Sequence, residues 1–224
     1  MAKVAVVLSG CGFKDGSEIH ESVSVLIHLA RVGAEYRCFA PDKPQAAAVN
    51  HATGKPEAHP RNCLVEAARI ARGQISPLST LDVDAFDAVV FPGGFGAATN
   101  LCTFGQDGAE CTVDPDVVRV IKGFHAAGKA IGLVCIAPVL AARVLGTKMG
   151  GPGCTITIGD DPGTAKAIAA MGSANSVKPV AEAAIDRRNR IVSTPAYMCE
   201  ARPNQVFDGV GRMVDSLLDL VSGS

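Results

Sequence analysis

Four short apolar segments constrain the fold of this chain more than any other feature. They cover residues 3–10, 34–41, 86–94 and 129–135, and glycine or proline lies at or beside the end of each one. Nearly continuous apolar segments of this length are typical of strands that are buried on both faces of a parallel sheet.

Segments with helical periodicity separate these predicted strands. The sequence predicts helices over residues 17–33, with Ser17 as the cap, over 61–73, over 114–129, and from Cys135 to about Leu145. Strands are predicted again over 154–159 and 189–198, and helices over 163–172 and 206–221. Strands that alternate with helices predict an α/β fold, with a doubly wound parallel sheet covered on both faces.

The length and composition indicate one domain. The chain has 224 residues, of which 48% are apolar and 19% charged, enough to bury a substantial core. Residues 41–62 are polar and break the alternation of strands and helices, so we interpret them as an inserted surface segment. No linker or composition change marks a boundary, and residues 1–224 are predicted to form a single domain.

Charge and hydropathy argue against two classes of partner. The formal net charge is −1 and no basic stripe is present, which argues against nucleic acid. No run of 18 apolar residues is present, which argues against a membrane span. A strand begins almost at the first residue, so we expect a cytoplasmic protein, or a mitochondrial one if a transit peptide has been removed.

The eight cysteines are predicted to be free thiols in a reducing compartment. None forms a CxxC pair, and no Cys/His cluster has the spacing of a zinc site. Disulfide frameworks belong to small secreted chains that lack a sufficient hydrophobic core, whereas this chain is long enough and apolar enough to form such a core. Because no Cys/His cluster has the spacing of a zinc site, we expect no bound metal.

Cys135 stands out because it lies between a predicted buried strand and a predicted helix. A nucleophile on such a sharp turn projects into the crevice at the end of the sheet. The N-terminus of the following helix favours an anion, which predicts a lowered thiol pKa. The Gly-x-Cys-x-Gly pattern is not met, since Ala137 replaces the second glycine. A small buried apolar side chain explains this cysteine equally well.

Two further strand ends carry candidate site residues. Gly93 and Gly94 follow the third strand, where their backbone N–H groups could bind substrate or a developing oxyanion, although an ordinary turn explains them too. Glu21 lies on the first turns of the first helix and could transfer protons. For an arbitrary glutamate, a solvated helix face is the better explanation.

Other motifs are less persuasive. Gly10, Gly12 and Gly16 follow the first strand, but their spacing is not that of a dinucleotide-binding loop. His28 and His125 fall within predicted helices, where packing or solvation explains them. No histidine follows Cys135, so the late histidine of a glutaminase triad has no counterpart.

Taken together, several stretches resemble one family. "VVLSGCGFKDGSEIHE", "FAPDKPQ", "RNCLVEAARIARG", "FPGGFGAATNL", "GLVCIAPVLAA" and "IVSTPAYM" are similar to the ElbB proteins, which are class-I glutamine amidotransferase-like members of the PfpI superfamily. The resemblance runs nearly end to end and includes residues 41–62. It implies a flavodoxin-like three-layer sandwich with a mainly parallel sheet.

The resemblance also implies an activity. ElbB proteins are associated with a weak glyoxalase activity, independent of cofactors and of glutathione, that converts glyoxal to glycolate, and with isoprenoid biosynthesis; animal relatives are mitochondrial. By this resemblance Cys135 is the elbow nucleophile, Glu21 contacts its thiol, and the N–H groups of Gly94 and Ile136 bind the oxyanion. The expected ligand is a small aldehyde, with no cofactor, and a homodimer is left open.

Two expectations follow for the reactive pair. Cys135 should be the one cysteine of the eight that is both activated and accessible. Glu21 should be protonated at neutral pH and donate its proton to the sulfur, because two like charges in a partly buried site disfavour each other. Two other functions share Cys135: a redox or stress sensor with an oxidisable thiol, and a glutaminase-like subunit of a partner synthase.

Overall fold

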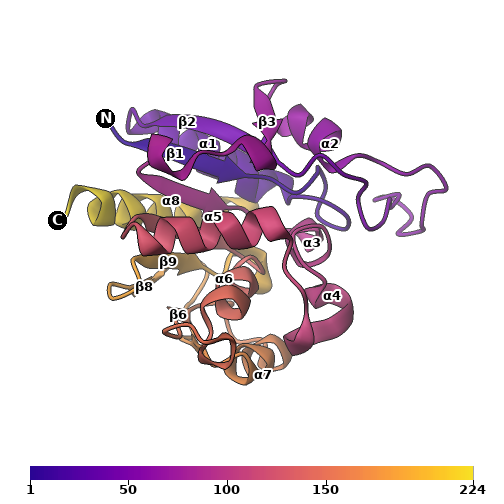
Figure 1. The fold of residues 1–224 in the computed structure, drawn as a ribbon. Coiled ribbons are helices and arrows are strands. Elements are labelled where there is room, and N and C mark those ends of the chain that lie inside the picture. The colour runs from indigo at the N-terminus through magenta and orange to yellow at the C-terminus, as the bar shows by residue number, and fades with distance from the viewer. Residues whose placement is uncertain (224) are drawn as a thin grey trace.

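A computed structural model describes residues 1–223 as a sheet with helices on both faces (Figure 1). The strands are β1 Lys3–Val7, β2 Glu35–Ala40, β3 Ile75–Pro77, β4 Ala88–Phe91, β5 Ala130–Val134, β6 Thr155–Ile156, β7 Ala174–Asn175, β8 Ala184–Asp186 and β9 Ile191–Thr194. The α-helices are α1 Ile19–Arg31, α2 Cys63–Ile70, α3 Phe95–Thr99, α4 Phe104–Asp107, α5 Pro115–Ala126, α6 Pro138–Leu145, α7 Pro162–Ala170 and α8 Pro203–Ser222. Short 3₁₀ turns cover Leu78–Thr80, Val83–Ala85, Gly108–Glu110, Thr147–Met149 and Ala196–Met198.

The main sheet has the strand order β3-β2-β1-β4-β5-β9-β8. All its pairings are parallel except that of β8 with β9. The chain therefore winds outward in both directions from β1 and β4, and the crevice at this switch point opens at the carboxyl ends of the strands. The loop after β1, the Pro92–Gly94 turn after β4 and Cys135 after β5 all lie at that edge.

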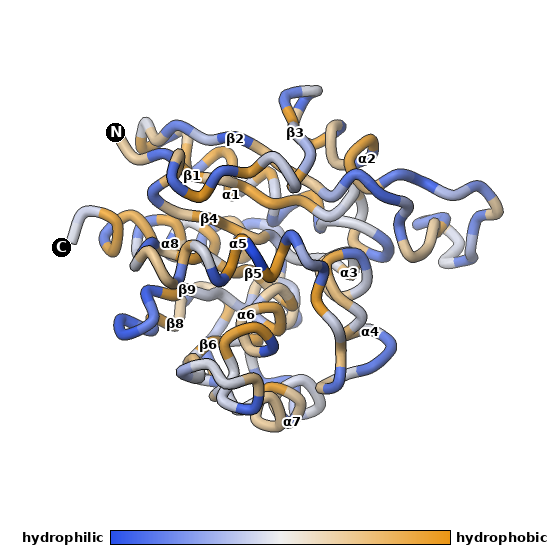
Figure 2. The backbone as a smooth tube through the Cα atoms, viewed as in Figure 1, coloured by the Kyte–Doolittle hydropathy of each residue, from blue (hydrophilic) through white to orange (hydrophobic). Residues whose placement is uncertain are grey.

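Alternate side chains of each strand enter two separate cores. Val4, Val6 and Leu8 pack with α1, α2 and α8, whereas Ala5 and Val7 pack with α3, α5 and α6. In Figure 1, α5 and α6 lie in front of the sheet and α1 and α8 lie behind it. This is the three-layer α/β sandwich expected from the sequence, and the strands appear as the mostly apolar centre in Figure 2.

Most of the predicted elements are present, with three corrections. The first helix is capped by Glu18 rather than Ser17, because the Glu18 carboxylate accepts the N–H of Glu21 at 2.7 Å. Residues 154–159 do not form a strand of the main sheet: only Thr155–Ile156 pairs, with β7, in a separate two-stranded sheet. The short strands β3 and β8 were not predicted.

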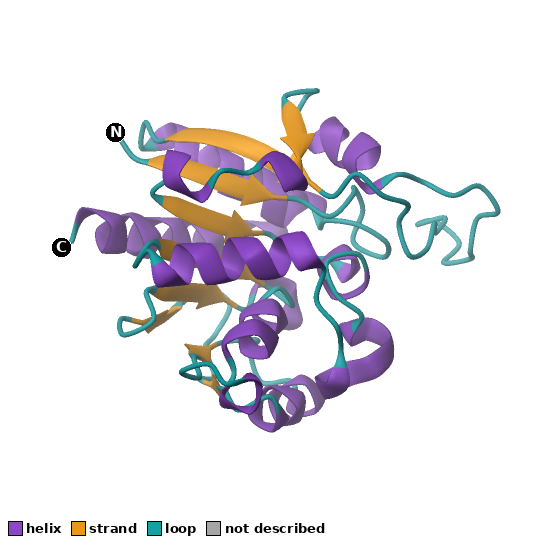
Figure 3. Cartoon of the chain, in the orientation of Figure 1, coloured by secondary structure: helices purple, strands orange, loops and turns teal. Residues whose placement is uncertain are grey.

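Residues 41–62 form neither helix nor strand and extend from the sheet edge (Figure 3). The segment is fixed to the loop after β1, because the Val49 N–H donates to the Asp15 carboxylate at 2.7 Å and the Gln45 amide donates to the Asp15 carbonyl at 3.0 Å. The Ala46 N–H donates to the Asn100 side chain at 2.8 Å. An ion pair between Lys43 and Asp114 ties the segment to the start of α5.

No helix within residues 1–223 is both long enough and apolar enough to cross a membrane.

Candidate active site

Cys135 occupies a strained elbow between β5 and α6. Its φ is +62°, in the left-handed region that side chains with a Cβ rarely adopt, and such strain costs roughly 1–3 kcal/mol. The neighbouring strand β9 holds this turn, since the Cys135 N–H donates to the Thr194 carbonyl at 2.9 Å. The strain places the side chain at the carboxyl edge of the sheet, where Pro138 begins the helix two residues after Ile136.

Glu21 brings a fully buried carboxyl to this elbow. Its Oε2 accepts the Gly93 N–H at 3.0 Å. Its Oε1 is buried and has no hydrogen-bond partner within residues 1–223, while the carboxyl group as a whole interacts with the Cys135 thiol. A buried oxygen without a partner is costly, so this carboxyl is suited to hold or accept a proton.

Two glycines allow this close approach. A Cβ on Gly93 would lie 2.5 Å from the Cys135 Cβ and 2.6 Å from Glu21 Oε2, so a side chain there would displace both reactive groups. Gly94 has a φ of +90°, and a Cβ on it would lie 2.4 Å from the Glu18 nitrogen. Other residue types therefore do not fit at these two positions.

The backbone N–H groups divide between the two reactive side chains. Those of Gly94 and Ile136 are directed at the Cys135 sulfur, and neither has another hydrogen-bond partner in the described chain. The Gly93 N–H donates to Glu21, so Gly93 holds the carboxyl in position. Gly94 and Ile136 thus form a pair of donors beside the nucleophile, which is the arrangement of an oxyanion hole.

The pKa of Glu21 is raised to about 8. Burial is the main cause, and the nearby Glu18 carboxylate adds to it, while the Cys135 thiol and the N–H groups of Tyr197 and Gly93 act in the opposite direction. The carboxyl is therefore protonated at neutral pH, as expected from the sequence.

The expected lowering of the Cys135 pKa is wrong. Burial raises the pKa of this thiol, and the Glu21 carboxylate raises it further, against the weaker effect of the Gly94 and Ile136 N–H groups. The physical reason is that removing the sulfur from water disfavours its charged form, which the sequence position beside a helix does not report. As pH rises through about 8, the carboxyl loses its proton before the thiol does, and the thiol then donates to the carboxylate. At neutral pH both groups hold their protons.

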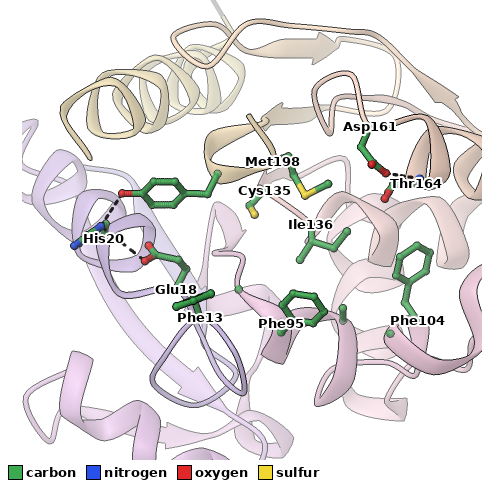
Figure 4. Close-up of a pocket in the computed structure, with 14 residues that line it drawn as sticks. Phe13, Glu18, His20, Phe95, Phe104, Cys135, Ile136, Asp161, Thr164 and Met198 are labelled. Atoms are coloured by element: carbon green, nitrogen blue, oxygen red, sulfur yellow. Dashed lines mark hydrogen bonds and ion pairs between the residues drawn. The ribbon is translucent and has the colours of Figure 1, made fainter. Parts of the chain in front are cut away.

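Cys135 opens into a pocket with a volume of about 790 Å³ (Figure 4). Its apolar walls include Phe13, Phe95, Ala98, Phe104, Ile136 and Met198. The Cys135 side chain is only 7% exposed, whereas Cys11 and Cys199 are partly exposed. The expectation that Cys135 alone of the eight cysteines is both activated and accessible is therefore wrong, because its pKa is raised and its side chain is nearly buried. A reagent reaches its sulfur through the pocket.

Polar side chains lie on one side of Cys135 (Figure 4), and two of them, Glu18 and Tyr197, were not singled out from the sequence. The His20 Nδ1 lies 2.7 Å from the Tyr197 hydroxyl and 3.8 Å from a Glu18 oxygen, and all three residues line the pocket. The position of Tyr197 just after β9 was the available signal, because the carboxyl ends of parallel strands meet at one edge. His28 and His125 pack elsewhere, against the Phe207 carbonyl and the Asn189 side chain.

No group of three His, Cys, Asp or Glu side chains within residues 1–223 is arranged to hold a metal ion. The groups that the structure brings together beside Cys135 are the Glu21 carboxyl and the backbone N–H groups of Gly94 and Ile136.

Comparison with solved structures first defines the class. A ThiJ/PfpI domain protein from Brachyspira murdochii has the same fold, with a TM-score of 0.59, 16% identity, and coverage of 97% of this chain and 96% of that one. An isoprenoid biosynthesis protein with an amidotransferase-like domain from Ehrlichia chaffeensis is much more similar, with a TM-score of 0.92, 35% identity, and coverage of 98% and 99%. No family model matches the chain.

Named relatives then define the family. The human "glutamine amidotransferase-like class 1 domain-containing protein 3, mitochondrial" is 51% identical over 98% of this chain and 83% of its own length. The rat "ES1 protein homolog, mitochondrial" is 49% identical over 98% and 84%. The chain belongs to this glutamine amidotransferase-like class 1, or ES1, family. Both relatives are mitochondrial by name, so they do not support the expected cytoplasmic location and agree with the mitochondrial alternative.

Proposed function

We propose that this protein converts glyoxal, or a related α-oxoaldehyde, to a 2-hydroxy acid without a cofactor or glutathione. The observation that carries the proposal is the contact between the buried Glu21 carboxyl and the Cys135 thiol, beside two N–H groups that have no other partner. A thiol, a proton acceptor and an oxyanion site are the groups that an aldehyde–thiol addition requires.

The first step is addition of the thiol to the aldehyde. The Glu21 carboxylate takes the thiol proton while the Cys135 sulfur forms a bond to the aldehyde carbon. The electron pair of the carbonyl bond moves to its oxygen, which the N–H groups of Gly94 and Ile136 stabilise. Glu21 returns the proton to that oxygen, which gives a hemithioacetal. A base with a pKa near 8 is well matched to this exchange at physiological pH.

The second step moves one proton between neighbouring carbons. The Glu21 carboxylate removes the proton from the carbon bonded to sulfur, and the electron pair forms an enediolate. Glu21 then gives the proton to the adjacent carbon, and the hydroxyl proton on the sulfur-bearing carbon moves to the neighbouring oxygen, so that the hemithioacetal becomes a thioester of a 2-hydroxy acid. Glu21 takes a proton from the water that attacks the thioester, the carbon–sulfur bond breaks, and Glu21 passes this proton to the departing thiolate. Glyoxal and one water molecule give glycolate, so no external oxidant or reductant is needed.

The alternatives fit these residues less well. The last histidine in the chain is His125, before Cys135, so the late histidine of a glutaminase triad is missing. A redox sensor would use the same sulfur, but it does not require the Glu21 carboxyl to exchange a proton with it. Turnover separates the enzyme from the sensor.

The test is glycolate formation from glyoxal by the purified protein, followed by proton NMR. We expect steady formation that falls to the uncatalysed background in Cys135→Ser. Cys199→Ser is the matched control, because Cys199 is a partly exposed cysteine that does not line the pocket. Equal rates in the parent and in Cys135→Ser would refute the proposed reaction, and oxidation of Cys135 without glycolate would favour the sensor.

A further inference from the structure

We infer that the substrate of this site is a neutral α-oxoaldehyde with an apolar substituent about the size of a phenyl ring. This inference rests on the proposed function and specifies its substrate class. Glyoxal, in this view, is a minimal substrate that uses the reactive end of the pocket and leaves the remainder unfilled.

The volume of the pocket is the first argument. About 790 Å³ lies within the range of pockets that bind drug-sized ligands, roughly 300–1,000 Å³. Glyoxal has four heavy atoms and occupies roughly a tenth of that space, given about 30 Å³ for a single water molecule. Most of the pocket must therefore serve a part of the substrate that does not react.

The second argument is the apolar wall that begins at the reacting atoms. Ile136 directly follows the nucleophile, and Phe95 directly follows the oxyanion donor Gly94. Figure 4 shows Ile136 and Phe95 between Cys135 and Phe104. A substituent on the aldehyde would extend along this wall toward Phe104 once its carbonyl carbon is bonded to sulfur.

The exposure of two aromatic side chains in this pocket is the third argument. Phe13 is 48% exposed and Phe95 is 56% exposed, and the Phe95 N–H donates to the Phe13 carbonyl at 2.8 Å, which fixes their backbones together. Neighbouring exposed aromatic groups are typical of ligand-binding surfaces. An apolar substituent would cover them.

Charge indicates that the substituent is neutral. Figure 4 shows Glu18 on one side of Cys135 and Asp161 on the other, and none of the residues that line the pocket is Lys or Arg. The pKa of Asp161 is lowered by hydrogen bonds from Thr164, so this carboxyl carries a negative charge at neutral pH. A substrate with its own carboxylate would be repelled from both sides.

The first experiment measures selectivity in turnover. We compare kcat/KM for phenylglyoxal, for glyoxal and for 4-carboxyphenylglyoxal in the parent, in Phe95→Ala and in Phe104→Ala. We expect the ratio of phenylglyoxal to glyoxal to fall about tenfold in Phe95→Ala. The exposed Phe95 side chain can be removed with little risk to folding, and Phe104→Ala should give a change in the same direction. Ile185→Ala, an exposed apolar residue on β8, is the control and should leave the ratio unchanged.

The second experiment does not depend on turnover. Rates of Cys135 alkylation by iodoacetamide, by N-phenyliodoacetamide and by its 4-carboxyphenyl analogue are measured by mass mapping and divided by the rates with free glutathione. We expect the normalised rate to be highest for the phenyl reagent and lowest for the carboxyphenyl reagent, and Phe95→Ala to reduce the preference.

The outcomes separate the two proposals. Preference in alkylation without turnover of any aldehyde refutes the proposed reaction and supports the pocket assignment. Turnover of glyoxal with no preference for the phenyl group in either experiment overturns the inference and leaves the reaction standing. A preference that disappears as protein concentration rises also overturns it, since a second copy of the chain would then cover the aromatic side chains.

Discussion

Two buried thiols, each paired with a neighbouring side chain, behave in opposite ways in this molecule. Cys135 faces the Glu21 carboxyl, and burial together with that carboxylate raises the pKa of the thiol. Cys111 faces the Cys102 thiol, and that contact together with Arg143 lowers the pKa of Cys111, while the pKa of Cys102 is raised. The cysteine with the lowered pKa is therefore not the one at the elbow.

Access and a proton acceptor distinguish the two pairs. Cys111 is fully buried, Cys102 is 4% exposed, and neither lines the pocket. The Cys102 sulfur donates to the Ala97 carbonyl at 3.3 Å, and Arg143 donates to the Cys111 carbonyl at 2.7 Å, so this pair joins structural elements. A thiol with an ordinary or raised pKa can still react when a base lies beside it and a pocket leads to it. A thiol with a lowered pKa, such as that of Cys111, is not a nucleophile when no substrate can reach it.

The largest expected effect comes from removing the proton acceptor. Glu21→Gln keeps the shape of the side chain but cannot exchange a proton, so glycolate formation from glyoxal should fall roughly 100- to 10,000-fold. Glu66→Gln is the control, because Glu66 is also a buried carboxylate but pairs with Arg69, away from the pocket. Turnover like that of the parent in Glu21→Gln would mean that another group moves the proton.

The next effect concerns stability and pH. Glu21 has a pKa of about 8 in the folded chain against an ordinary value of 4.5, so between those pH values the folded chain holds a proton that the unfolded chain has lost. Its contribution to the free energy of unfolding is full below pH 4.5 and is lost as pH rises through about 8, by up to about 1.4 kcal/mol per pH unit. Urea unfolding at several pH values should show this slope in the parent and in Glu66→Gln. If Glu21→Gln retains the full slope, the carboxyl is not protonated in the folded chain.

A smaller effect, in rate, contrasts the two cysteines directly. Alkylation of Cys135 by iodoacetamide should rise roughly tenfold per pH unit up to about pH 8, where Glu21 becomes available as an acceptor. Cys111 should remain unlabelled over the same range because it is fully buried. Mass mapping of each cysteine after brief exposure measures both. If the alkylation rate of Cys135 is already constant above pH 6, the thiol pKa is lowered, as expected from the sequence, and not raised.

The smallest effect is that of Cys111→Ser. Loss of the contact with Cys102 should lower the free energy of unfolding by about 1 kcal/mol, the typical cost of a single substitution. Glycolate formation should be unchanged, since Cys111 does not line the pocket. A large loss of turnover in a folded Cys111→Ser protein would remove the functional distinction between the two pairs.

The fold was largely predictable because its central strands are buried on both faces. The apolar residues of β1, β4 and β5 give nearly continuous hydrophobic segments that cannot be mistaken for surface strands. β3 and β8 were missed because they have three residues each, at the two edges of the sheet, where little apolar pattern is required.

The site was predictable in position and not in its electrostatics. A strand that runs into Cys135 shortly before Pro138 indicates an elbow from local sequence alone. The raised thiol pKa depends on how tightly distant elements enclose the sulfur, and no local pattern reports that. The neighbourhood of His20 and Tyr197 likewise arises from contact between α1 and the turn after β9, which are 177 residues apart.

The surface segment formed by residues 41–62 helps to keep the candidate active site assembled, because it is hydrogen-bonded to the loop after β1. If Gln45 and Val49 detach, the fully buried Asp15 carboxylate loses its N–H donor, and an unsatisfied buried group of this kind costs about 1–3 kcal/mol. Segment and loop should then open together as one cooperative unit, with their amide protons exchanging at a common rate. The loop leads directly to Glu18, which caps the helix that carries Glu21, so the lifetime of the assembled site is set in part by residues that never touch the substrate.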